Sequence, residues 1–103
     1  MIPFTLSSPS DISLALGRRV QARRLDHGWT QAELAARAGV AVDTLKKFER
    51  TGQVSLLRLI RLAIALGSVN EFEGLLREGG PQSLRDLDRK KHRRGRTFRS
   101  PEG

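Results

Sequence analysis

The side chains best suited to molecular recognition gather in one short segment, residues 42–50. Leu45 and Phe48 recur at helical spacing and are expected to point inward. The opposite side of the same segment presents carboxylate, hydroxyl and cationic groups, carried by Asp43, Thr44, Lys46, Lys47 and Arg50. Because this outer face can both donate and accept hydrogen bonds, it is the first candidate for a binding surface.

Other chemistry is poorly represented in the chain. The sequence has no cysteine, which excludes disulfides, thiolate metal sites and cysteine nucleophiles. His27 and His92 stand alone, without the cluster of ligands that a metal needs. No Ser-His-Asp set and no pair of carboxylates stands out, so we expect a protein that is not an enzyme and carries no cofactor.

Charge points to a polyanionic partner, but its distribution matters. The 103 residues carry a net charge of +8, which attracts nucleic acid first and anionic membranes second. Residues 1–79 hold 11 basic and 8 acidic side chains, whereas residues 80–103 hold 8 and 3. Most of the excess therefore lies in the last quarter of the chain, and the argument for DNA must come from local pattern.

The chain contains no sign of export or of membrane insertion. Its apolar stretches are far shorter than a membrane span. Its first residues, MIPFTLSSPS, lack the basic start and long apolar run of a signal peptide. We therefore expect a cytoplasmic protein with no membrane partner.

Five short helices are expected to position the outer face of residues 42–50. Ser10 can cap a first helix that starts at Asp11 and ends before Gly28. A Thr30–Glu33 capping box opens the second helix, and Gly39 permits a tight turn into the third. Ser55 caps the fourth helix, and a second capping box, Ser68 with Glu71, opens the fifth. An all-α bundle follows from this pattern.

The two ends of the chain are expected to differ from the bundle. Residues 1–9 contain two prolines and predict a short extended arm, so the domain proper spans residues 10–79. Residues 80–103 predict a flexible, disordered basic tail. Its basic patch consists of Arg89, Lys90, Lys91, Arg93, Arg94 and Arg96.

A longer sequence motif around the second and third helices resembles a known family. The string WTQAELAARAGVAVDTLKKFERTG, residues 29–52, resembles the Xre/Cro-like family of phage repressors and bacterial regulators. The resemblance covers about residues 11–77 and implies a five-helix, lambda-repressor-like DNA-binding domain. Its most specific positions are Thr30, Gln31, Glu33, Leu34, Ala35, Gly39, Val40, Leu45, Phe48, Glu49 and Gly52.

The resemblance also implies a role for each matching residue. It places Arg24 and Glu49 in an internal ion pair between the first and third helices. The base-reading set that it implies in the major groove is Val42, Asp43, Thr44 and Lys47. The set that it implies at DNA phosphates is Gln31, Lys46 and Arg50.

The chemistry of these residue types agrees with that transfer. Lys47 can donate to guanine, Val42 can contact a thymine methyl group, and Asp43 can accept from cytosine N4. Asp43 alternatively serves as a favourable charge at the helix amino terminus. One position departs from the family, because Ala41 stands where a Ser or Thr often caps the recognition helix, and its side chain cannot cap.

Over the whole chain, a softer resemblance is to HipB-type antitoxins, the DNA-binding partners of HipA-like kinases. It rests on residues 46–67, on NEFEGLL at 70–76, on SLRDL at 83–87 and on the basic end. It implies an autorepressor of a toxin–antitoxin operon that binds duplex DNA at a palindromic operator and engages a kinase toxin. A free-standing phage or prophage regulator and a protein-interaction module that neutralises a toxin are the alternatives.

We also expect the chain to form a homodimer. A five-helix core needs less apolar surface than is supplied by Leu56, Leu75, Leu76 and the arm Ile2–Leu6. A DNA operator with two-fold symmetry is also matched by a protein with two-fold symmetry.

Three roles are open for the tail. It can contact phosphates, fold on a protein partner, or only aid solubility.

Overall fold

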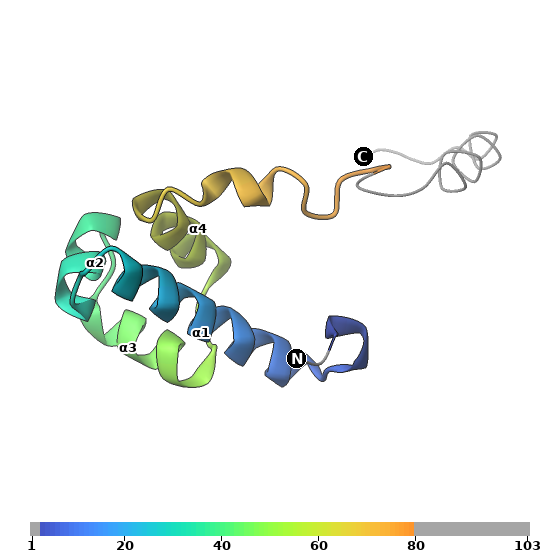
Figure 1. Cartoon of the computed structure of the whole chain (residues 1–103), viewed down its shortest axis with the longest axis horizontal. Coiled ribbons are helices and arrows are strands. Elements are labelled where there is room, and N and C mark those ends of the chain that lie inside the picture. Colours follow the sequence, from blue (N-terminus) through green and yellow to red (C-terminus); the bar gives the residue numbers. More distant parts are fainter. Residues whose placement is uncertain (1–2, 80–103) are drawn as a thin grey trace, which may run out of the picture. The chain divides into compact units, whose positions relative to one another are not determined.

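The computed structural model describes residues 3–79, which form four α-helices and two short 3-10 helices (Figure 1). This part of the chain contains no strand, so the all-α prediction is confirmed. The α-helices are α1 (Pro9–Asp26), α2 (Gln31–Ala38), α3 (Val42–Thr51) and α4 (Leu56–Ala65). The 3-10 helices are η1 (Phe4–Leu6) and η2 (Val69–Phe72). The basic residues expected in the tail, 89–96, lie outside the described residues.

The amino-terminal arm is not extended as the sequence suggested. Phe4–Leu6 form η1, closed by hydrogen bonds from Leu6 N to Pro3 O (2.9 Å) and from Ser7 N to Phe4 O (3.1 Å). Pro3, which fixes its own φ, stands at the start of this turn with φ −60°. The two residues before it lie outside the description.

Helix α1 begins two residues earlier than predicted. Ser8, not Ser10, is the N-cap, and its hydroxyl accepts from the Asp11 N–H at 3.1 Å. The Asp11 carboxylate in turn accepts a hydrogen bond from the Ser8 N–H, which completes a capping box. Pro9 then occupies the first helical position, where its missing N–H costs nothing. The combination of cap, proline and acid outweighs the single cap that Ser10 offers.

Helices α2 and α3 form the expected pair around a tight turn. The Thr30–Glu33 capping box is present, with bonds of 3.1 and 2.8 Å. Gly39 ends α2 with φ +72°, a conformation that glycine adopts without strain. Ala41 precedes α3 and makes no side-chain cap, as predicted.

The core lies where α1, α2, α3 and α4 meet. Helix α1 packs on α3, and α2 packs on both α3 and α4. The largest fully buried side chains are Leu34, Leu45, Phe48 and Leu62. They come from α2, α3 and α4, so the recognition-helix candidate is part of the core rather than an appendage. Leu25 of α1 lies outside this core and is 60% exposed.

The fifth helix is replaced by the four-residue 3-10 helix η2. Ser68, the predicted cap, directly precedes η2, and its hydroxyl accepts a hydrogen bond from Nη1 of Arg23 at 2.6 Å. A first compact unit ends at Val69. In the described residues that follow, Leu75 and Leu76 are exposed, at 59% and 95%.

No helix within residues 3–79 is long and apolar enough to cross a membrane. The same residues contain no group of three or more metal-ligating side chains.

Candidate nucleic-acid interface

Helix α3 is held by one face and free on the other. Leu45 and Phe48 are 0% and 1% exposed, and Glu49 is 3% exposed. A carboxylate with so little exposure needs partners, because burying an unpaired charge is costly. The surroundings of Glu49 therefore fix the orientation of the whole helix.

Arg24 of α1 is the main partner of Glu49. Its Nε lies 2.8 Å from Oε2 and its Nη2 lies 3.0 Å from Oε1, so the guanidinium binds the carboxylate through two hydrogen bonds. The third donor, Nη1, reaches the backbone oxygen of Trp29 at 2.8 Å. Arg24 thus ties α1 both to α3 and to the loop that leads into α2. This is the pair that the family resemblance implies.

Gln31, the first residue of α2, also contacts Glu49. Its Nε2 donates to Oε1 at 3.0 Å, so this carboxylate oxygen accepts from two side chains. Sequence comparison placed Gln31 at a DNA phosphate, whereas the structure directs its amide nitrogen inward. Gln31 still stands at the amino terminus of α2, the part of a helix that attracts phosphates.

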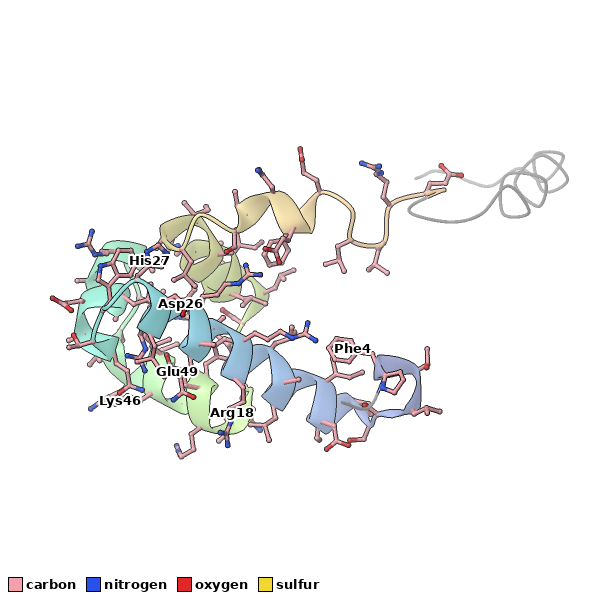
Figure 2. The ribbon with its side chains drawn as sticks, viewed as in Figure 1. Phe4, Arg18, Asp26, His27, Lys46 and Glu49 are labelled. Atoms are coloured by element: carbon pink, nitrogen blue, oxygen red, sulfur yellow. The ribbon has the colours of Figure 1, made fainter. Side chains whose placement is uncertain are left out.

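The outer face of α3 carries exposed polar groups. Asp43, Lys46, Lys47 and Arg50 are exposed, and Thr44 is half-buried. Within the described part of the chain, none of these five side chains forms a hydrogen bond or ion pair. Figure 2 shows Lys46 on the outside of α3, with Glu49 turned toward α1. Val42, predicted to read a base, is partly buried and packs against the core.

Two glycines bring the backbones of α1 and α3 into contact. A Cβ atom on Gly17 of α1 would overlap the carbonyl oxygen of Phe48 and lie 3.5 Å from Cα of Glu49. A Cβ atom on Gly52, just after α3, would collide with the backbone of Ser13. Only glycine permits this close approach, and Gly52 also has φ +83°. The role of Gly17 was missed from the sequence, since a glycine inside a helix reads only as a weak point.

An aromatic stack supports the loop before α2. The rings of His27 and Trp29 are parallel to within 11°, with centroids 4.2 Å apart. The guanidinium of Arg37 lies 4.2 Å from the centroid of the Trp29 ring. Because Trp29 also accepts the bond from Arg24, the stack and the buried ion pair meet at one residue. We assign this cluster to support of the α1–α2 junction.

The geometry is that of a helix-turn-helix, and comparison with known families agrees. Residues 20–73 match the helix-turn-helix family of Xre-like domains, and the chain belongs to that family. The domain is of the kind found in DNA-binding transcription regulators. Comparisons with curated proteins and with solved structures gave no match.

Proposed function

We propose that the chain is a sequence-specific transcriptional repressor, not an enzyme, that reads duplex DNA with the outer face of α3. The observation that carries this proposal is the two-faced environment of α3. Leu45, Phe48 and Glu49 fix it to the domain, while Asp43 and Lys47 project from it without partners in the described part of the chain. A helix held in this way fits the major groove and presents donors and acceptors to base edges.

The roles of the individual side chains follow from their exposure. Lys47 donates to a guanine, and Asp43 accepts from a cytosine amino group or strengthens the start of α3. Thr44 contributes from a half-buried position, and Val42 acts mainly through packing. Lys46 and Arg50 bind phosphates.

A homodimer on a palindromic operator belongs to the same proposal. One recognition helix reads only a few base pairs, and two-fold operators mirror two-fold proteins. Leu6 is 76% exposed and Leu56 is 63% exposed, so apolar surface remains outside the core. Light scattering at micromolar concentration, with and without DNA, should give twice the mass of one chain. A monomer in both conditions contradicts the dimer.

The biological setting that we propose is a toxin–antitoxin operon with a HipA-like kinase as partner. The support is the resemblance of residues 46–67, 70–76 and 83–87 and of the basic end to HipB-type antitoxins. A kinase-like reading frame beside the gene, and copurification of its product with this chain, are the expected observations. A phage integrase or lysis gene in that place favours a prophage regulator. Toxin neutralisation without DNA binding favours an interaction module.

The DNA-binding proposal is tested by selection from a random-sequence duplex pool. The enriched duplex and a scrambled copy are then titrated with the wild-type chain and with Lys47→Ala and Thr44→Ala. We expect Lys47→Ala to reduce discrimination between the two duplexes by about 1–3 kcal/mol. Arg77→Ala, which also removes a cation but lies outside α3, should leave discrimination unchanged. Failure to enrich any duplex, or unchanged discrimination in both α3 variants, would refute the assignment.

A further inference from the structure

We propose that Arg18 of α1 is a DNA-backbone contact that acts together with Lys46 and Arg50 of α3. The inference rests on the proposed function and extends it to a helix that sequence comparison did not assign to DNA. The ligand is the phosphodiester backbone beside the major groove, bound without regard to base sequence.

The packing of Gly17 determines where Arg18 projects. Gly17 lies against the backbone of Phe48 and Glu49, so this side of α1 faces α3. Arg24 projects from the same side two turns later and reaches Glu49. Arg18 follows Gly17 and is turned about 100° around the helix. Buried Val20 is turned the other way, so Arg18 lies on the solvent side of the α1–α3 contact.

The same contact is bordered on α3 by two further cations. Glu49 faces α1, and Arg50 is the next residue toward the outer face. Lys46 stands one turn before Arg50, because residues four apart are neighbours on a helix. Figure 2 shows Arg18, Glu49 and Lys46 along one edge of the domain, where α1 and α3 meet, and shows Phe4 on the other side of α1. Arg18, Lys46 and Arg50 therefore lie along the solvent side of the contact between α1 and α3.

These three cations have no anionic partner among the described residues. Within residues 3–79, none of the three forms an ion pair. The carboxylate between the helices, Glu49, is buried and accepts from Arg24 and Gln31. Asp43 is exposed on α3 and stands one turn before Lys46, but among the described residues it forms no ion pair with it. An unpaired row of this kind is suited to the regularly spaced charges of a DNA strand.

The neighbouring arginine provides a contrast. Arg19 is also exposed on α1, but its guanidinium lies 4.8 Å from the centroid of the Phe4 ring, on the side away from α3. Arg18 and Arg19 thus carry the same charge on the same helix and differ in the direction that they face. Arg19→Ala is the matched control for Arg18→Ala.

The test measures the salt dependence of binding. Wild type, Arg18→Ala, Arg18→Lys and Arg19→Ala are titrated with the selected duplex and its scrambled copy between about 50 and 200 mM salt. Circular dichroism confirms that each variant is folded. Arg18→Ala should lower the slope of log K against log salt by about 1 and weaken binding to both duplexes by the same factor. Arg18→Lys should retain the slope, and Arg19→Ala should match wild type.

The outcomes separate this inference from the function on which it rests. If Arg18→Ala and Arg19→Ala have equal slopes while the wild type binds its duplex, the Arg18 contact is wrong and the proposed function stands. If Arg18→Ala selectively weakens the selected duplex, Arg18 reads bases and the backbone assignment is wrong. If the wild type binds neither duplex, both proposals are overturned.

Discussion

Arg24 of α1 and Glu49 of α3 are joined by two hydrogen bonds of 2.8 and 3.0 Å inside the domain. Their side chains are 9% and 2% exposed. A buried pair of this kind contributes less to stability than its geometry suggests, because both ions lose their hydration. Removing only one partner is strongly destabilising, since the remaining charge stays buried without compensation. The pair therefore specifies how α3 is oriented more than it stabilises the fold.

Glu49→Gln should lower the free energy of unfolding by about 3–5 kcal/mol, because it leaves Arg24 buried beside a neutral amide. Urea denaturation followed by circular dichroism measures the loss. Asp26→Asn makes the same chemical change at an exposed carboxylate and should shift stability by no more than about 0.5 kcal/mol. Equal effects of the two substitutions would show that the pair is not what holds α3.

Gly17→Ala should destabilise the domain by about 1–3 kcal/mol, although alanine is the better helix former. The added methyl group meets the Phe48 carbonyl and forces α3 away from α1. Thermal unfolding measures the effect, and DNA affinity should fall with it. The reverse change at an exposed site of α1, Ala22→Gly, should cost only about 1 kcal/mol and leave the DNA affinity of the folded domain intact. A stabilised Gly17→Ala variant would contradict the close backbone contact.

Ala41→Ser should raise the free energy of unfolding by about 1 kcal/mol. Ala41 has the extended backbone of an N-cap, with φ −68° and ψ 142°, but no side chain that can accept a bond. A serine there can bond the free N–H groups in the first turn of α3. Ala36→Ser, at an exposed position inside α2, should give no gain. Stability is read from urea denaturation, and equal midpoints for Ala41→Ser and wild type would refute the cap.

Arg37→Ala should reduce stability by about 0.5–1 kcal/mol through loss of the cation–π contact with Trp29. Thermal unfolding provides the measurement. Arg18→Ala removes an exposed arginine that has no aromatic ring beneath it among the described residues, and it should have a smaller effect on stability. If Arg37→Ala is no more harmful than Arg18→Ala, the cation–π contact contributes nothing.

Local signals explain which parts of the fold were predictable from the sequence. The Thr30–Glu33 box and Gly39 act through bonds and dihedral angles within a few residues, so α2 and its turn were placed correctly. The start of α1 was misplaced because Ser8 and Ser10 are both good caps, and the choice depends on Pro9 and Asp11 together. The expected fifth helix is represented by the four residues of η2, and Ser68, its predicted cap, bonds a side chain 45 residues away, a contact that no local pattern predicts.

In the candidate site, too, the features set by local sequence were predictable and those set by helix packing were not. The outer positions of α3 follow from helical period and family motif, and the structure leaves Asp43 and Lys47 exposed as expected. The engagement of Gln31 with Glu49 and the contact of Gly17 with α3 depend on how helices distant in sequence pack. No local pattern carries that information, so these two features could be found only from the folded chain.

The division of α3 into a fixed face and a free face has an evolutionary consequence. Replacements at Asp43, Lys46, Lys47 and Arg50 disturb no hydrogen bond or ion pair of the described residues. Replacements at Leu45, Phe48 or Glu49 disturb the core. On the proposed function, mutation of the outer face changes the DNA sequence that is read at little cost in stability, whereas mutation of the inner face lowers the stability of the fold. Exchange of Asp43 and Lys47, the proposed base readers among these four, should transfer specificity between related domains without a second round of stabilising changes.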